Sequence, residues 1–444
     1  MSSGLRGLRK LSGALSAGLV DSAFSSLATF IAGLSAQRLA LDDLGVYSLF
    51  FFGFVLAAVA PAQLLLVPAE VAVLGATIQQ QSFALRTTVK MAAPIALAAA
   101  GIMAGGVALA APIVRPGIEL ATLVPLALSA AAFTFLSPLQ DHLRRIAHQT
   151  NRSYVAAGMS TLQVASVIAA VVAMIRLGVA PVWIPFGSLA LANVVSGAVG
   201  YHVLVRGMYP RRMPLLKRHL LMRSGGWLLL SGSLDQLFGL LGAFALAAIA
   251  GAGAAGHNEA VRQLGQPMAV VAVGVTTVAR PHSMRAGHAR DRDLARRIST
   301  AYLAALGGLG ALYALAIGIS WPFNPLPELL PKAYDQPGLL VAAIIALTIN
   351  QFSSVFRNEL VGGGLERNLA PISVTAGGSY LLGILALAPV LGAFAIPVAT
   401  VLQRPGEFLV YRRALRRLYG PEATPAPDPP LELVVDGRAE VATP

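Results

Sequence analysis

The sequence contains no cysteine, and only 12% of its 444 residues are charged. The absence of cysteine excludes disulfides, thiolate metal sites and a cysteine nucleophile. The histidines form neither an HExxH motif nor a pair four residues apart, so we expect no zinc site and no cofactor. The charged share is about half of that typical of a soluble domain, which excludes a soluble enzyme and a disordered chain.

Apolar residues are abundant instead. They make up 56% of the chain, and the mean hydropathy is +0.69. A soluble protein of this length could not bury so much apolar surface. Because one membrane span takes about 20 apolar residues, this composition provides for about 12 spans. We therefore predict an all-α polytopic membrane protein with about 12 transmembrane helices in two six-helix bundles.

Charges and prolines between the uncharged segments define the domain organisation. The widest basic connection, residues 206–223, divides the chain into halves of six spans. Residues 368–403 carry no charge and are too long for one span, so we predict a hairpin near Pro389. The predicted domains are a cytoplasmic N-terminal tail over 1–10, a first bundle over 11–205, a cytoplasmic basic linker over 206–223, a second bundle over 224–418 and a disordered cytoplasmic tail over 419–444.

The distribution of lysines and arginines predicts the orientation of these spans in the membrane. With the N-terminus inside, 28 of the 33 basic residues fall on the inner side. The other five are Arg38, Arg115, Arg176, Arg262 and Lys332. Cytoplasmic loops collect Lys and Arg, so the split predicts a cytoplasmic-membrane protein with both termini in the cytoplasm. It also explains the net charge of +13 without nucleic acid as a partner.

Two halves of six spans suggest an internal repeat. Aligning Gly45 with Gly256, each at the start of the second span of its half, places Asp21 opposite Gly232. Asp235 follows Gly232 by three residues, which is about one helical turn. The two aspartates could therefore occupy equivalent faces of the first span in each half.

Residues 36–48 read AQRLALDDLGVYS. The informative positions are Arg38-Leu39, the acidic pair Asp42-Asp43, and Gly45-Val46-Tyr47-Ser48. This stretch resembles the outer end of the first span in the polysaccharide (O-antigen type) flippases of the multidrug/oligosaccharidyl-lipid/polysaccharide exporter superfamily. Asp235 and the segment Gly364-Leu365-Glu366-Arg367 also resemble features of that family.

The resemblance implies two six-helix bundles around a central cavity that opens alternately to each side. The substrate would be a polyprenyl-diphosphate-linked oligosaccharide for cell-surface polysaccharide synthesis, and no covalent chemistry would occur. The implied partners are this lipid-linked glycan, membrane lipids, H⁺ or Na⁺ as a coupling ion, and other polysaccharide-assembly membrane proteins.

Asp21 and Asp235 are the candidate ion-coupling residues. An acid inside a span costs about 2.5–3.5 kcal/mol on insertion scales, so each should face protein or water. One interpretation is a proton or sodium site that couples transport. The other is a structural hydrogen bond between helices, with Ser22, Ser25 or Ser26 as partners of Asp21.

Arg262 and Arg38 are the candidate substrate-binding residues. If the spans that carry them are neighbours, as the resemblance implies, their guanidinium groups could converge on a diphosphate. The alternative is that both reach lipid head groups, or pair with nearby acids. Inner span ends hold Arg280, Arg357 and Arg404, for which we expect ordinary anchoring.

Three other functions fit part of the sequence. A cation-coupled multidrug exporter of the same superfamily would favour an acid-rich cavity. A membrane glycosyltransferase could use Asp42 or Asp43, but the first outer loop is too short to build a substrate platform. A non-transporting scaffold would not need Asp21 and Asp235 inside spans. We therefore expect no enzyme.

Overall fold

The computed structural model describes residues 2–36, 38–39, 41–114, 117–205, 213–318, 336–420, 431–435 and 438–440. They form two compact units. Unit 1 comprises residues 1–229 together with 428–444, and unit 2 comprises residues 230–427. Almost all described residues are helical, as expected for segments whose backbone polar groups must be satisfied without water.

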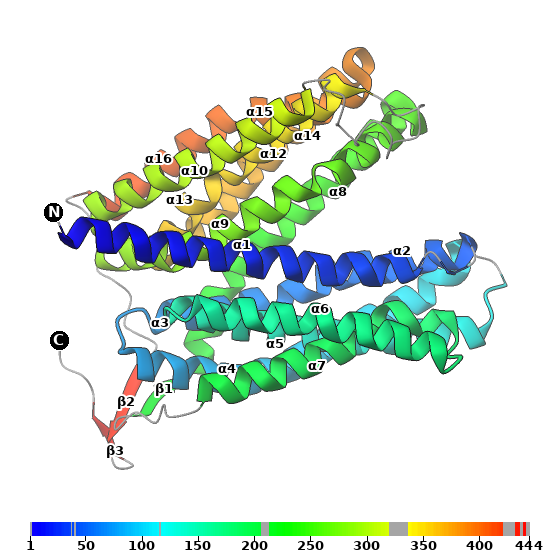
Figure 1. The fold of residues 1–444 in the computed structure, drawn as a ribbon. Coiled ribbons are helices and arrows are strands. Elements are labelled where there is room, and N and C mark those ends of the chain that lie inside the picture. The colour runs from blue at the N-terminus through cyan, green and yellow to red at the C-terminus, as the bar shows by residue number, and fades with distance from the viewer. Residues whose placement is uncertain are drawn as a thin grey trace. The chain divides into compact units, whose positions relative to one another are not determined.

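Unit 1 is a bundle of long helices that pack side by side (Figure 1). Its elements are α1 (Ser2–Ala36), α2 (Leu41–Pro61), the π-helical turn η1 (Ala62–Leu66), α3 (Val67–Ala72), α4 (Ile78–Val114), α5 (Leu120–Gln149), α6 (Ser153–Arg176), the 3-10 turn η2 (Pro181–Trp183) and α7 (Ile184–Val205). The π-helical turn directly follows Pro61, whose missing N–H interrupts the regular ladder.

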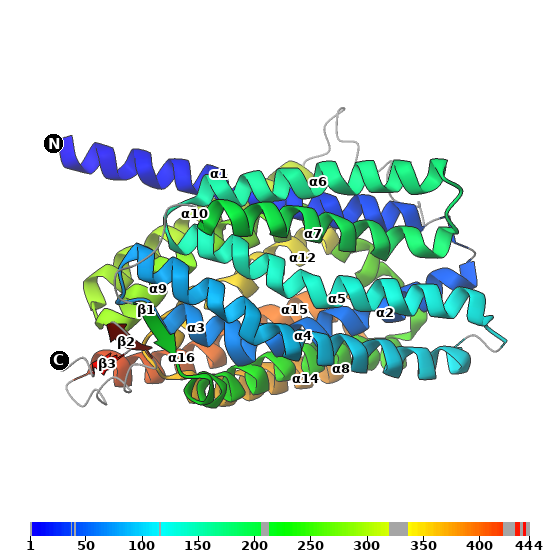
Figure 2. The same ribbon diagram turned by 90° about the horizontal axis from the view of Figure 1, so that it is seen from below.

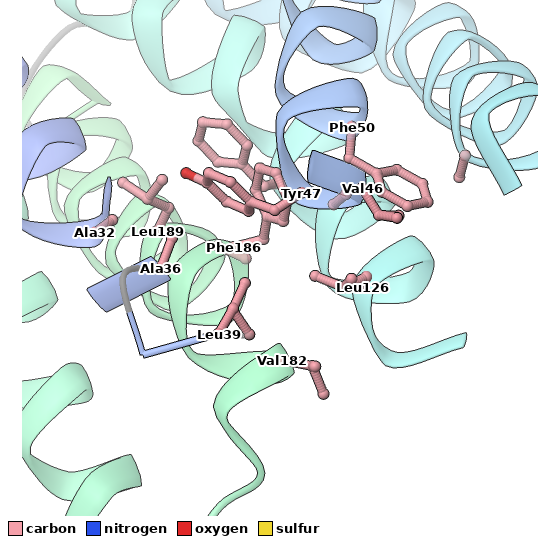
Figure 3. Close-up of a cluster of buried hydrophobic side chains, with 14 of the residues drawn as sticks. Ala32, Ala36, Leu39, Val46, Tyr47, Phe50, Leu126, Val182, Phe186 and Leu189 are labelled. Atoms are coloured by element: carbon pink, nitrogen blue, oxygen red, sulfur yellow. The ribbon is translucent and has the colours of Figure 1, made fainter. Parts of the chain in front are cut away.

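The core of unit 1 includes the stretch on which the family resemblance rests. Val46 and Tyr47 are buried, and the ring centroid of Tyr47 lies 4.7 Å from that of Phe186. Figure 3 shows this pair in a buried cluster that also contains Phe50 and Leu189. The Gly-x-Tyr-Ser segment therefore docks the start of α2 against α7.

Unit 2 contains the remaining spans. Its elements are α8 (Arg218–Leu264, of which residues 230 onward belong to this unit), α9 (Gln266–Ala289), α10 (Arg292–Gly318), α12 (Pro337–Gln351), α13 (Ser353–Gly362), the turn η4 (Glu366–Asn368), α14 (Leu369–Leu391), the turn η5 (Gly392–Phe394), α15 (Ala395–Leu402) and α16 (Arg404–Tyr419). Helix α8 is broken at Gly251, whose φ of 85° is open to glycine but strained for other residues.

Ten stretches of the described chain are long and apolar enough to cross a membrane. One of them, Glu366–Tyr419, folds back at η5 and contains both α14 and the α15–α16 pair. Helix α9, together with the part of α8 after Gly251, supplies the remaining span. The fold is thus the predicted one of two six-helix bundles, and the hairpin near Pro389 is confirmed, with its turn at Gly392.

A small antiparallel sheet belongs to unit 1 (Figure 2). Strand β1 (Met213–Leu216) lies in the predicted linker and pairs with β2 (Leu431–Val435), which pairs with β3 (Arg438–Glu440). β1 also packs against α4. The tail expected to be disordered thus contributes two strands, because linker and tail satisfy each other's backbone groups. The predicted linker likewise ends earlier, since α8 begins at Arg218.

Candidate functional site: intramembrane ion pairs

Asp21 is the centre of a buried network in unit 1. Its carboxylate is 1% exposed and accepts hydrogen bonds from Arg144 Nε at 2.8 Å and Arg144 Nη2 at 2.9 Å. Ser160 Oγ donates at 2.6 Å, and His148 Nε2 lies 3.1 Å from Oδ2. Arg144 also donates to Ser25 at 2.8 Å. The network ties α1 to α5 and α6.

The placement of Arg144 corrects the sequence interpretation, which assigned this residue to an inner loop. Arg144 lies within α5 and is nearly as buried as its partner, with 11% of its side chain exposed. Its helix continues to Gln149, and the guanidinium contacts Asp21 on α1 inside the bundle. The partner of Asp21 is therefore an arginine 123 positions away, whereas the hydrogen-bonding alternative had assumed nearby serines.

A second buried acid, Glu70 on α3, was missed in the sequence. Its Oε1 lies 2.9 Å from Arg145 Nε and 3.1 Å from His142 Nδ1. The other ring nitrogen of His142 contacts Thr88 Oγ1 at 2.8 Å. Gln149 donates to the carbonyl oxygen of Glu70 at 2.8 Å. This network joins α3 and α4 to α5.

The sequence held a signal for both networks. His142 and Arg145 are three residues apart, and Arg144 and His148 are four apart. Side chains at these spacings share a helix face. The end of α5 thus presents one basic face to Glu70 and another to Asp21. These spacings, rather than metal-ligand spacing, are the informative feature of the two histidines.

Unit 2 contains a corresponding ion pair. Arg357 on α13 donates from Nη1 to Asp235 Oδ2 and from Nη2 to Ser231 Oγ, each at 2.7 Å. Asp235 and Ser231 are one helical turn apart on α8. Arg357 had been expected only to anchor the inner end of its span.

The two ion pairs support the predicted repeat. Each joins the first span of its unit to the fourth, over sequence separations of 123 and 122 residues. In both, the arginine also binds a serine four residues from the aspartate. Their exposure differs. The unit 1 pair is buried, whereas in unit 2 the side chains of Asp235 and Arg357 are 42% and 27% exposed.

A second arginine lies on the neighbouring helix α16. Arg404 donates to Glu407, Asn350 and Ser353, which joins α16 to α12 and α13. Glu407 is buried. Polar side chains of three helices thus gather at one level of unit 2, around Arg357 and Arg404.

The predicted substrate residues are only partly described. Arg38 is exposed in the connection between α1 and α2. Arg262 lies in α8, but its side chain is outside the described residues, as is that of Asp42. The convergence of Arg38 and Arg262 stays a prediction. Asp42 and Asp43 fall in the first turn of α2, so the connection between α1 and α2 is residues 37–40.

Metal binding has no support in the part of the chain that the structure describes. No three His, Asp or Glu side chains there are grouped as metal ligands. The acids of the described networks are paired with guanidinium groups instead. The arrangement can therefore hold helices together, and it can exchange protons or ions where a carboxylate is accessible.

No protein-family model matches the sequence, and no curated protein matches it. Solved structures do resemble the fold. The MATE transporter VcmN of Vibrio cholerae in the bent form is 15% identical, with a TM-score of 0.70 over 94% of this chain and 100% of that chain. A MOP superfamily transporter from Pyrococcus furiosus, described as having a binding pocket of reversed polarity, is 13% identical. Its TM-score is 0.71 over 92% of this chain and 96% of that chain.

A multidrug resistance MATE family transporter of the MOP superfamily, in an outward-facing conformation, is also similar. It is 14% identical, with a TM-score of 0.69 over 92% of this chain and 96% of that chain. These matches cover nearly the full length of both compared chains, so the likeness extends to both six-helix units. The chain is a multi-pass membrane protein with the fold of MATE transporters of the MOP superfamily.

Proposed function

We propose that this protein is an alternating-access transporter that moves a polyprenyl-diphosphate-linked oligosaccharide across the cytoplasmic membrane. The fold supports transport, since similar structures belong to transporters, one of them outward-facing. The stretch around Tyr47 supports the flippase branch, because it resembles that family in sequence. Both termini would lie in the cytoplasm, as the distribution of basic residues indicates.

The observation that carries the choice of an anionic substrate is the pairing of the acids. Asp21, Glu70 and Asp235 each contact an arginine in the described structure. A carboxylate already neutralised in this way is poorly suited to hold an organic cation. A diphosphate, in contrast, needs arginines to offset its lost hydration.

Arg262, and less strongly Arg38, would hold the diphosphate through their planar guanidinium groups. Asp235 is the better candidate for a coupling proton or sodium ion, because its carboxylate is accessible, whereas Asp21 is sealed by Arg144 and Ser160. The transporter would work with membrane lipids and other polysaccharide-assembly membrane proteins.

Depletion of the protein in its host cell tests this function. Lipid-linked glycan should accumulate on the cytoplasmic leaflet, and wild-type protein should reverse the accumulation. Arg262→Ala should fail to do so, and Arg262→Lys should succeed only in part, because an ammonium keeps the charge but loses the fork. Unchanged lipid intermediates with lost sugar transfer would instead support an enzyme.

A cation-coupled multidrug exporter is the second candidate. The exposed carboxylate of Asp235 favours it, because an organic cation could compete with Arg357 for this group. One of the similar structures is also a multidrug resistance transporter. Export of organic cations by the purified protein, without movement of lipid-linked glycan, would establish this alternative.

A further inference from the structure

One buried acid differs from all the others. Among the described residues, four carboxyl side chains are buried, and three of them contact an arginine. These pairs are Asp21–Arg144, Glu70–Arg145 and Glu407–Arg404. The fourth is Glu359 on α13, which is 3% exposed.

Glu359 forms no ion pair with any residue that the structure describes. Its Oε2 accepts a hydrogen bond from Tyr419 at 3.3 Å, and its Oε1 has no hydrogen-bond partner. The other ionisable side chains near these ends of the elements packed against α13 belong to α9, the turn after it, α10, η4 and α16. They are Arg285, His288, Arg290, Asp291, Arg292, Asp293, Arg296, Glu366, Arg367, Arg412, Arg413, Arg416 and Arg417.

Helices α9 and α13 approach each other closely at glycines, which excludes water from Glu359. A Cβ on Gly287 of α9 would overlap the carbonyl oxygen of Glu359, and one on Gly362 would overlap that of Met284. The backbones of α9 and α13 are therefore in direct contact at two successive points. Small residues permit such close approach of helices in membranes.

The end of α16 also packs beside Glu359. Tyr419 is the last residue of this helix and, among the described residues, supplies the only hydrogen bond to the carboxyl. Leu418 lies so close to Gly363 that a Cβ there would overlap its side chain. Displacement of this helix end would thus open Glu359 to water.

Burial without a counter-cation favours the neutral form of a carboxyl group, because the ionised form loses its hydration and gains nothing in return. A protonated carboxyl loses much less on burial and can still hydrogen-bond to Tyr419. In an opened arrangement, water would solvate the ionised form. The closed packing of α9, α13 and α16 therefore binds a proton more tightly than the opened one.

We propose that Glu359 is a proton-binding site of unit 2, and that its protonation stabilises the packing of the end of α16 against α9 and α13. This inference goes beyond the proposed transport, since proton binding can be measured without any substrate. A failure of the flippase assay would leave it standing.

Infrared difference spectroscopy of the purified full-length protein tests the site directly. A protonated buried carboxyl has its own C=O stretching band. We expect Glu359→Gln to remove such a band, and the wild-type band to decrease as the pH is raised. Glu407→Gln is the matched control, because its carboxylate is paired with Arg404 and should contribute no band. A band unchanged in Glu359→Gln would overturn the proposal.

Should Glu359→Gln not fold, Tyr419→Phe provides the test. It keeps the ring but removes the donor that stabilises the ionised carboxylate. The band should then persist to higher pH than in the wild type. An unshifted titration would show that the band does not belong to Glu359.

The coupling to α16 needs a second measurement. A spin label on Arg413→Cys, at an exposed position of α16 in this cysteine-free chain, reports its mobility. Because the closed packing holds the proton, mobility should increase as the pH rises. It should stay low in Glu359→Gln, whose amide mimics the protonated group. An equal pH effect in both proteins would refute the coupling.

Discussion

The buried network around Asp21 predicts a large cost for loss of Arg144. In Arg144→Met, the volume of the side chain is roughly kept, but Asp21 loses two hydrogen bonds, at 2.8 and 2.9 Å. Among the described residues, Ser160 and His148 would remain as its partners. Removing one partner of a buried ion pair costs about 3–5 kcal/mol, since the other charge stays buried. That corresponds to roughly 150- to 5,000-fold in the folding equilibrium.

The corresponding ion pair of unit 2 supplies a matched control for this substitution. Arg357→Met removes the same kind of interaction in unit 2, over a contact of 2.7 Å, but both groups are partly exposed. Exposed pairs contribute about 0–1 kcal/mol, so this variant should be destabilised much less. The contrast between the two variants isolates the effect of burial.

Unfolding of the purified protein in mixed micelles, with increasing SDS, measures both costs. A double-mutant cycle with Asp21→Asn should give a coupling free energy of about 2 kcal/mol with Arg144→Met, because the two groups are in direct contact. Equal and small effects of Arg144→Met and Arg357→Met would refute the reasoning. Asp21 would then not be held by a buried ion pair.

Three further predictions follow from separate features. Gly225→Ala should cost about 1–3 kcal/mol or more in the same assay, because its Cβ would overlap the backbone of Leu64, whereas Gly226→Ala, at an open position, should be nearly neutral. Asp235→Asn should abolish the dependence of transport on an ion gradient while the protein stays folded; equal loss of transport with and without the gradient would indicate a structural role instead. A cysteine at Ser2 should react with an impermeant reagent only from the cytoplasmic side. Labelling from outside would show that the predicted orientation is wrong.

The sequence was sufficient for the fold because the spans are defined by uncharged length alone. Residues 368–403 could be assigned to a hairpin since a single span would have been too long, and the turn lies at Gly392. The sequence also predicted equivalent positions for Asp21 and Asp235, and each of them contacts an arginine in the structure. Both inferences use distances along the chain, which the sequence contains in full.

The partners of the intramembrane acids could not be predicted in the same way. Counting basic residues assigns Arg144 to the inner side but cannot tell whether it faces water or the bundle. Glu70 directly follows an uncharged stretch of sequence, and its burial on α3 depends on tertiary packing that this stretch does not reveal. The strands of the tail depend on a pairing between residues more than 200 positions apart.

Transport of a lipid-linked glycan in proteoliposomes tests the central claim most directly. Purified protein would be reconstituted with a fluorescent polyprenyl-diphosphate oligosaccharide, and the fraction accessible to a reagent outside would be followed over time. We predict protein-dependent movement across the bilayer that Arg262→Ala abolishes and Arg262→Lys restores in part. No movement by folded wild-type protein, with or without an ion gradient, together with export of an organic cation by the same preparation, would contradict the account.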